Sequence, residues 1–363
     1  MTRIRLAVIG VGHLGKEHAR ILSTLSDVEL VGVADVNLDQ AQAVAQRCGT
    51  RAYTEYWPLL NLVDAAVICV PTVYHHAVAS EFLRHGIPLL VEKPLASTLQ
   101  QAQELTDLAR GAGVVLQVGH IERFNPGFEE LQNRLLQPKF VECQRCGSFT
   151  GRSTDISVVL DLMIHDLDLL LTLVDAPVTA VDALGVSVLT EHEDVANARL
   201  HFANGCVATL TASRVSTSPS RQMRVWAPEG YVHVDFAKRT LDLVQPSAEL
   251  RRHGLDLRRL DPAALALLKT EVFGRHLETV HLDRNKGDQL TRELEDFVRC
   301  VQHGQSPRVS GDDGCRALAL ATRILEQIQT HRWQGTADGP GGPRSLPAPL
   351  GPLFRRAEDG AAA

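Results

Sequence analysis

Residues 5–15 read RLAVIGVGHLG, a short apolar run that ends in three closely spaced glycines. The run Arg5–Ile9 has the length and the continuous apolar character of a strand that is buried on both faces of a sheet. The glycines Gly10, Gly12 and Gly15 follow it directly, and a segment with helical spacing comes next. A strand, a glycine-rich turn and a helix in this order predict the start of a βαβ unit.

The same alternation of apolar runs and helical patterns continues through the first third of the chain. The further predicted strands are Glu29–Ala34, Ala65–Val70, Pro88–Val91 and Val114–Gly119. The predicted helices are Lys16–Leu25, Leu38–Cys48, Tyr74–His85 and Leu99–Gly111. Strands separated by helices of this length predict a doubly wound parallel sheet. We therefore expect residues 1–120 to form a Rossmann domain, which makes the fold class α/β.

The pattern changes after residue 120, where short strands follow one another with turn signals between them. These strands are predicted at Lys139–Phe149, Val178–Leu189, Asn197–Phe202, Cys206–Ser213, Gln222–Ala227 and Tyr231–Asp235. Helices are predicted at Val159–Val174, Asp288–His303 and Asp312–His331. This arrangement predicts an α+β domain with a large, mostly antiparallel sheet at residues 121–334, for substrate binding and oligomerisation. Residues 335–363 are rich in Gly, Pro and Ala without periodicity, and are predicted to be a disordered tail.

The composition excludes several classes of protein. The 363 residues carry a net charge of −6 with both signs interspersed, so we expect binding neither to nucleic acid nor to an anionic membrane. No apolar stretch approaches the roughly 20 residues that cross a bilayer. Seven scattered cysteines, and no secretory signal before the first strand, predict a reduced, cytoplasmic protein. Cys143 and Cys146 form a C-x-x-C pair without a second ligand pair, so no metal site is expected.

The three glycines and Asp35 have the spacing of a dinucleotide-binding fingerprint. Gly10 permits the tight turn, Gly12 lets the backbone approach a pyrophosphate, and Gly15 allows close packing of helix and strand. The N-terminus of the helix then faces the phosphates with the positive end of its dipole. Asp35 ends the second predicted strand, where its carboxylate accepts hydrogen bonds from ribose hydroxyls and repels a 2′-phosphate. The sequence therefore predicts NAD as the cofactor rather than NADP.

Two further stretches carry polar residues where apolar ones are expected. Lys93, in VEKPL (91–95), stands at the carboxyl end of a predicted parallel strand, where open α/β sheets bind ligands. Its other interpretation is a lysine that extends to solvent. Asp161 and His165 are four residues apart in an apolar helix, so they share a face on which the carboxylate can orient the imidazole. Because acids buried around a histidine cost free energy, a functional role is favoured there.

Together these motifs resemble the Gfo/Idh/MocA family of oxidoreductases. The matching stretches are the glycine motif, Val70-Pro71-Thr72 with His75, Glu92-Lys93-Pro94 and Asp161-x-x-x-His165, and the resemblance covers residues 3 to about 332. It implies hydride transfer from a sugar carbinol to NAD. The cofactor-binding residues that it implies are Gly10, Gly12, His13, Leu14, Gly15, Asp35, Val70, Pro71, Thr72, His75, Glu92 and Lys93.

The resemblance also implies a division of catalytic roles. His165 is expected to be the general base, Lys93 to position the hydroxyl or relay its proton, and Asp161 to orient the site and bind the sugar. The hydroxyl proton must leave as hydride leaves the carbon, and a histidine with a pKa near neutrality suits that transfer. The family further implies that open sheets pair in a homodimer or homotetramer.

The stretch GHIERFNP at residues 119–126 resembles the branch of the family that oxidises the 3-hydroxyl of UDP-N-acetylglucosamine. An aminotransferase partner then converts the 3-oxo sugar nucleotide to a 2,3-diamino sugar for lipid A or other surface glycans. The candidate substrate contacts are Arg123, Phe124, Asn125, Arg152, Asp161 and His165. For the two arginines, the other interpretation is a surface or interdomain salt bridge.

The sequence also leaves other functions open. One is a dehydrogenase of the same family that acts on a free cyclitol or hexose, as inositol dehydrogenases do. Another is an NAD-binding regulator without turnover, although a pure binder has no need for the pair Lys93 and His165. An NAD-dependent glycosidase is disfavoured, because such enzymes often carry an export signal and none is expected here.

Overall fold

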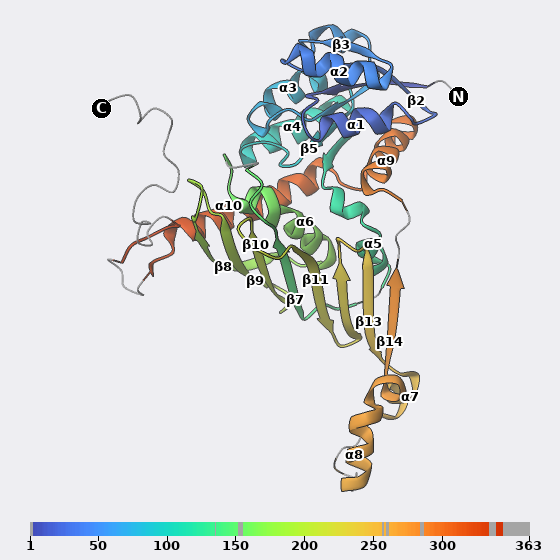
Figure 1. The fold of residues 1–363 in the computed structure, drawn as a ribbon, viewed down its shortest axis with the longest axis vertical. Coiled ribbons are helices and arrows are strands. Elements are labelled where there is room, and N and C mark those ends of the chain that lie inside the picture. The colour runs from blue at the N-terminus through green and yellow to red at the C-terminus, as the bar shows by residue number, and fades with distance from the viewer. Residues whose placement is uncertain are drawn as a thin grey trace.

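The computed structural model describes residues 3–134, 136–151, 155–255, 258, 261–283, 287–333 and 339–343. The described chain forms two sheets, with the Rossmann sheet at one end of a larger one (Figure 1). Two late helices, α9 (Gln289–His303) and α10 (Gly311–Thr330), lie where the two parts meet.

The first sheet has six parallel strands in the order β3-β2-β1-β4-β5-β6, which is the order of a dinucleotide-binding Rossmann fold. Its strands are β1 (Ile4–Ile9), β2 (Val28–Ala34), β3 (Arg51–Tyr53), β4 (Ala65–Ile68), β5 (Leu89–Glu92) and β6 (Leu116–Gly119). Its helices are α1 (Gly15–Leu22), α2 (Leu38–Cys48), α3 (Thr72–Arg84) and α4 (Leu99–Ala112). The predicted fold class is confirmed, and the strand order reverses between β1 and β4, where such sheets bind their ligands.

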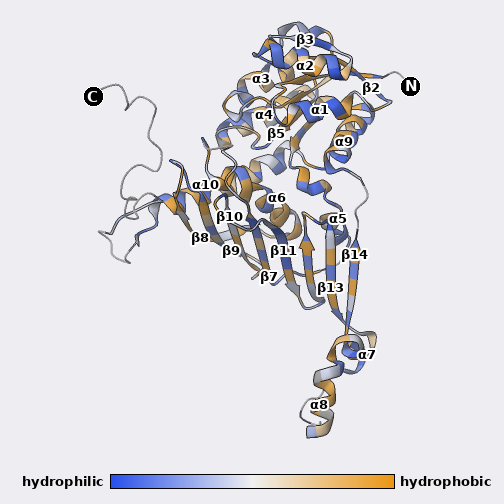
Figure 2. Ribbon diagram, viewed as in Figure 1, coloured by the Kyte–Doolittle hydropathy of each residue, from blue (hydrophilic) through white to orange (hydrophobic). Residues whose placement is uncertain are grey.

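The second sheet has eight strands in the order β14-β13-β12-β11-β7-β10-β9-β8, antiparallel except for the pairing of β7 with β10. They are β7 (Phe140–Cys146), β8 (Val178–Val186), β9 (Val195–Phe202), β10 (Val207–Ser213), β11 (Ser220–Ala227), β12 (Gly230–Asp235), β13 (Thr240–Pro246) and β14 (Leu277–Asp283). Apolar and polar residues alternate along these strands, as the colours of Figure 2 show. The apolar face packs against α5 (Pro126–Gln132), α6 (Ile164–Leu173) and α10.

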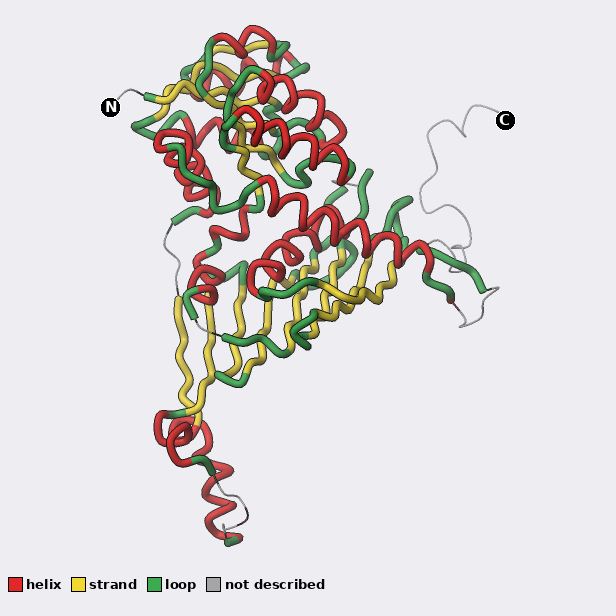
Figure 3. Tube along the Cα trace, turned by 180° about the vertical axis from the view of Figure 1, so that it is seen from behind, coloured by secondary structure: helices red, strands yellow, loops and turns green. Residues whose placement is uncertain are grey.

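The last two helices complete the cores of both parts. Leu294 and Phe297 of α9 belong to the buried cluster that contains β1 and α1. Along α10, Leu318 lies in the other Rossmann cluster, whereas Ile324 lies in the core of the large sheet. Seen from behind, α10 runs from the Rossmann domain along the large sheet (Figure 3). The boundary predicted at residue 120 thus lies between the two sheets, while α9 and α10 join their cores.

Some elements have no counterpart in the sequence-based prediction. The strand β3 is three residues long, which is too short for a periodic pattern. The neighbouring strands β13 and β14 end the large sheet, and charged residues interrupt their apolar positions. Beyond their ends, α7 (Ala248–His253) and α8 (Pro262–Glu271) form an arm that projects from the sheet (Figure 1).

The helix predicted at Val159–Val174 has two parts. A π-helical turn covers Val159–Met163, and α6 continues from it. In a π-helix each N–H bonds five residues back, and such turns are often found at functional sites.

Part of the segment predicted to be a disordered tail is described. Residues 339–343 lie against the end of α10, where the indole N–H of Trp333 donates to the backbone oxygen of Gly342 (3.0 Å). Residues 335–338 and 344–363 lie outside the described residues. Among the helices that are described, none combines the length and the apolar character needed to cross a membrane.

Candidate active site

The glycine turn between β1 and α1 has the geometry that a dinucleotide requires. Gly10 has φ +83°, and a Cβ there would lie 2.7 Å from the backbone of Cys69. A Cβ on Gly15 would lie 1.9 Å from the backbone oxygen of Gly10, so strand and helix can meet only with glycine here. A Cβ on Gly12 would meet nothing within 4 Å, which leaves open space for a pyrophosphate. His13 and Leu14 are exposed beside it.

Asp35 follows β2 and is tied to the glycine turn. Its carboxylate accepts hydrogen bonds from the amides of Val11 (2.8 Å) and Asn37 (2.9 Å) and from Gln40 Nε2 (3.1 Å). The side chain remains partly exposed. A carboxylate has about four acceptor sites, so capacity remains for a ribose hydroxyl. These residues fit an NAD adenosine half.

His75 links the two loops that follow β4 and β5. Its Nε2 lies 2.8 Å from the backbone oxygen of Val70, and its Nδ1 lies 2.9 Å from that of Pro94. The side chain is buried, and burial lowers the pKa of His75 despite these hydrogen bonds. Pro71 and Thr72 begin α3 beside it. His75 therefore fixes the wall of the crevice from behind.

Lys93 joins the Rossmann domain to the π-helical turn. Its Nζ donates hydrogen bonds to the backbone oxygen of Asp161 (2.7 Å) and to the carboxylate Oδ1 of the same residue (3.3 Å). Glu92 accepts a hydrogen bond from the Lys93 amide (3.2 Å) and contacts His18 Nε2 (2.7 Å). Burial acts to raise the pKa of Glu92, but the contacts with His18 and Lys93 together outweigh it and hold this pKa below its usual range. The buried pair fixes the backbone of Lys93.

His165 lies in the first turn of α6, partly exposed, with its Nδ1 buried. Burial, followed by the positive charges of Lys93 and Arg145, lowers the pKa of His165 well below its usual range. The ring is therefore neutral near pH 7 and able to accept a proton. Within the described residues no hydrogen bond joins it to Asp161, which differs from the expected orienting contact. The carboxylate of Asp161 instead accepts a hydrogen bond from Lys93.

His120 is a site residue that the sequence-based prediction missed. It follows the end of β6, at the same sheet edge as Lys93, and is 1% exposed. Its ring lies edge-on to that of His165, with centroids 6.3 Å apart, and neither of its nitrogens has a partner among the described residues. The available signal was its position: a polar residue directly after a buried strand of a parallel sheet.

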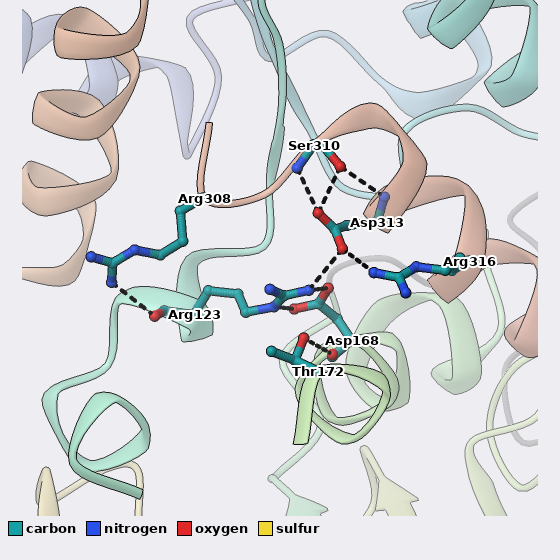
Figure 4. Close-up of polar contacts among 7 residues, drawn as sticks. All are labelled: Arg123, Asp168, Thr172, Arg308, Ser310, Asp313 and Arg316. Carbon is teal, nitrogen blue, oxygen red and sulfur yellow. Dashed lines mark hydrogen bonds and ion pairs between the residues drawn. The ribbon is translucent and has the colours of Figure 1, made fainter. Parts of the chain in front are cut away.

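Arg123 occupies a closed ion network rather than an open surface (Figure 4). It is 6% exposed, and its guanidinium donates two hydrogen bonds to Asp168 (2.7 and 2.9 Å) and one to Asp313 (3.4 Å). Arg145 is paired in the same way, with Asp166 (3.0 and 2.8 Å) and Glu122 (2.8 Å). The salt-bridge interpretation of Arg123 agrees with this geometry.

The neighbouring substrate candidates also lie in this layer. Phe124 is buried, with the guanidinium of Arg308 4.7 Å from its ring centroid. Asn125 caps α5 by accepting from the Gly127 amide (3.0 Å) and is fully buried. Arg152 lies outside the described residues. The structure thus brings Lys93, Asp161, His165 and His120 together, and sets Arg123, Phe124 and Asn125 behind them.

One group of potential metal ligands occurs within the described part of the chain. His18, Cys69 and Glu92 place ligand atoms within 4.8 Å of one another. The hydrogen bond between His18 and Glu92 already pairs two of these atoms. This hydrogen bond, next to Lys93 in the chain, accounts for the close approach of His18 and Glu92.

The Rossmann sheet, its glycine turn and Asp35 are typical of an NAD-dependent oxidoreductase. Two family models agree: the oxidoreductase family NAD-binding Rossmann fold of Gfo/Idh/MocA matches residues 4–120, and the Gfo/Idh/MocA C-terminal domain matches residues 133–233. The chain belongs to the Gfo/Idh/MocA family, as its motifs predicted.

Individual relatives span nearly the whole chain. It is 36% identical over 330 residues to UDP-N-acetylglucosamine 3-dehydrogenase from Acidithiobacillus ferrooxidans, which covers 91% of this chain and 98% of that enzyme. A solved structure of that enzyme has a TM-score of 0.78 and 35% identity, over 90% of this chain and 98% of its own. Myo-inositol 2-dehydrogenase from Thermotoga maritima is 24% identical over 91% of this chain and 97% of its own length. Levoglucosan dehydrogenase with NADH shares the fold (TM-score 0.75, 17% identity, 90% of this chain and 97% of its own).

Proposed function

We propose that this NAD-dependent sugar dehydrogenase oxidises the 3-hydroxyl of UDP-N-acetylglucosamine, or of a close UDP-sugar, to a ketone. The observation that carries the proposal is the 36% identity to an enzyme with this activity over nearly the full length of both chains. Inositol dehydrogenases match over a similar length at lower identities, from 24% to 32%. A free cyclitol or hexose is therefore the alternative substrate.

The catalytic roles that we propose are supported by the contacts at the sheet edge. Bound NAD supplies the hydride acceptor. Lys93 exchanges part of its contact with Asp161 for the substrate oxygen, so its ammonium charge favours loss of the hydroxyl proton. The neutral ring of His165 accepts that proton, and its depressed pKa keeps it ready to do so at pH 7. The carboxylate of Asp161 then hydrogen-bonds the sugar and keeps Lys93 aligned.

The cofactor and substrate contacts are proposed as follows. The glycine turn, Asp35 and the loop of Val70 to Thr72 would hold NAD. Arg152 is proposed to bind the diphosphate or the N-acetyl group. Arg123, Phe124 and Asn125 would support the site from behind, because they are buried and engaged elsewhere.

The product defines the partners that we propose. A 3-oxo sugar nucleotide carries a ketone that an aminotransferase can convert to an amine, giving a 2,3-diamino sugar for lipid A or other surface glycans. The large sheet is proposed to pair face to face with that of a second copy in a homodimer or homotetramer.

The test is the appearance of NADH absorbance when protein and NAD are mixed with UDP-N-acetylglucosamine, with myo-inositol or with glucose. A parallel reaction contains 2-oxoglutarate and an aminotransferase, because oxidation to a ketone can be uphill. NADH with the UDP-sugar alone supports the proposal. Formation with a free polyol assigns the protein to the cyclitol side of the family, and silence with all three contradicts both.

A further inference from the structure

Three ring nitrogens of His120 and His165 are buried and unpaired within the part of the chain that the structure describes. They are Nδ1 and Nε2 of His120 and Nδ1 of His165. The rings meet edge to face, with planes at 90° and centroids 6.3 Å apart. A polar atom buried without a partner is costly, and native proteins pair such atoms with other groups or with internal water. Three of them in adjoining rings indicate a shared partner between the rings.

The surroundings keep His120 neutral and leave it as an acceptor. Burial is the largest effect on its pKa and lowers it. The charged groups facing His120 are Asp168 from α6, Arg123, Glu92 and Lys93. Those facing His165 from other elements are Lys93, Arg145 of β7 and Arg221 of β11, all cations. The carboxylates of its own helical segment are engaged elsewhere, Asp161 with Lys93 and Asp168 with Arg123. A neutral imidazole has one donor and one acceptor, so His120 offers His165 an acceptor, which the cations do not.

We propose that His120 is a positioning residue for His165 and that one internal water joins the two rings. The proposal rests on the function proposed above, in which His165 is the general base. The Nδ1–H of His165 donates to the water, and the water donates to the unprotonated nitrogen of His120. Nε2 of His165 then carries the lone pair that accepts a proton from a hydroxyl. His120 acts without touching the substrate, by fixing the tautomer and the direction of the base.

Proton transfer then has a defined end state. The O–H bond of the substrate breaks, its proton forms an N–H bond at Nε2 of His165, and its electron pair forms the carbonyl bond as hydride leaves the carbon for NAD. The imidazolium keeps its Nδ1–H hydrogen bond to the water, which is stronger when the donor is a cation. His120 therefore favours the protonated form of His165 and opposes the burial and the cations that disfavour it.

The first test measures the tautomer and the titration of His165, and it does not require turnover. Protein labelled with 15N in its histidine rings reports the tautomer and the titration of His165 by NMR, and His165→Gln identifies its signals. His120→Phe removes both nitrogens but keeps a planar ring, and His120→Gln restores an acceptor. We expect the Nδ1–H tautomer of His165 in the unchanged protein and in His120→Gln. In His120→Phe we expect mixed tautomers and a titration about one pH unit lower, the size of one charge-assisted hydrogen bond.

The second test follows hydride transfer with the same variants across pH. For His120→Phe we expect kcat/KM to fall about tenfold or more, its acid limb to move down by about one pH unit, and the KM for NAD to stay constant. His120→Gln should recover most of the rate. A ring that merely fills space would leave the tautomer and the acid limb unchanged in His120→Phe, and that result overturns the inference. If no sugar is oxidised but the NMR coupling is present, the proposed function fails while the coupling of the rings stands.

Discussion

Two groups of polar side chains lie next to each other between the domains, and they differ in how completely they are paired. The guanidinium groups of Arg123 and Arg145 each hold an aspartate with two hydrogen bonds. Around His165, three buried ring nitrogens have no partner among the described residues. Both groups are largely buried, so burial alone does not distinguish a structural role from a catalytic one.

Pairing does distinguish them. A buried ion pair whose hydrogen bonds are complete has no capacity left for a ligand, and it determines how the helices and the sheet fit together. Unpaired atoms at a sheet edge can still bind a ligand, but leaving them buried without a partner lowers the free energy of unfolding. Substitutions in the paired group should therefore reduce stability, whereas substitutions in the unpaired group should reduce activity.

The largest effect is expected in the unpaired group. His165→Ala and Lys93→Ala should each lower the rate of hydride transfer by roughly a thousandfold, because a proton acceptor or a positioned positive charge is lost. The affinity for NAD, measured by fluorescence titration, should stay within about threefold, and single-turnover absorbance gives the rate. Turnover that survives both changes would remove these residues from the site.

The paired group should respond in stability. Arg123→Met leaves the carboxylates of Asp168 and Asp313 without their shared cation and should lower the free energy of unfolding by about 3–5 kcal/mol in urea. Adding Asp168→Leu to the same chain should restore part of the loss. The control is Arg5→Met, which breaks an exposed pair with Asp64 and should cost less than about 1 kcal/mol. Equal losses for the two arginines would mean that the buried network has no special role.

The same contrast explains how far the sequence could predict the site. Gly10, Gly12 and Asp35 act within one βαβ unit, so their roles follow from local spacing. Arg123 is different, because it is 45 residues from Asp168 and 190 from Asp313. Its partners depend on how η2 (Ile121–Phe124), α6 and α10 pack, which periodicity does not report.

Local spacing was also insufficient to predict side-chain contacts within one helical segment. Spacing predicted a contact between Asp161 and His165, but the carboxylate of Asp161 contacts Lys93 instead. His120 carries no motif signal of its own, and its importance depends on the ring of His165, which lies on another element. The sequence thus predicts which elements carry the chemistry, and tertiary packing decides which side chains meet.

Asp35 is intermediate between the two groups in its pairing, since its carboxylate is partly paired and partly exposed. Its substitution should change activity less than that of His165 or Lys93. Asp35→Ala removes the acceptor for the ribose hydroxyls and the charge that repels a 2′-phosphate. We expect the ratio of kcat/KM for NAD to that for NADP to fall about ten- to hundredfold, the value of one hydrogen bond to a charged group. Asp35→Asn is the matched variant that keeps the size and should retain more of the binding of NAD. A variant that still rejects NADP would contradict the ribose role.

Glu293 of α9 tests whether an unpaired atom always signals a function. It is fully buried, neither carboxylate oxygen has a partner among the described residues, and it belongs to α9 rather than to a loop that follows a Rossmann strand. Burial, and then the charges of Glu92 and Asp296, raise the pKa of Glu293 well above its usual range. Since its pKa is higher folded than unfolded, Glu293 destabilises the protein increasingly as pH rises above the usual range of a glutamate.

Glu293→Gln should therefore stabilise the protein by about 1 kcal/mol near pH 8. The gain should shrink as pH falls towards about 4, because the carboxyl of Glu293 then becomes protonated in the unfolded chain as well as in the folded one. Urea unfolding across this range measures the difference, and kcat should not change. Asp296→Asn on the same helix is the comparison: its carboxylate accepts a hydrogen bond from the Arg308 amide (3.0 Å), so it should lose stability instead. If Glu293→Gln instead lowers kcat at constant stability, the buried carboxyl serves the reaction and belongs with His120 and His165.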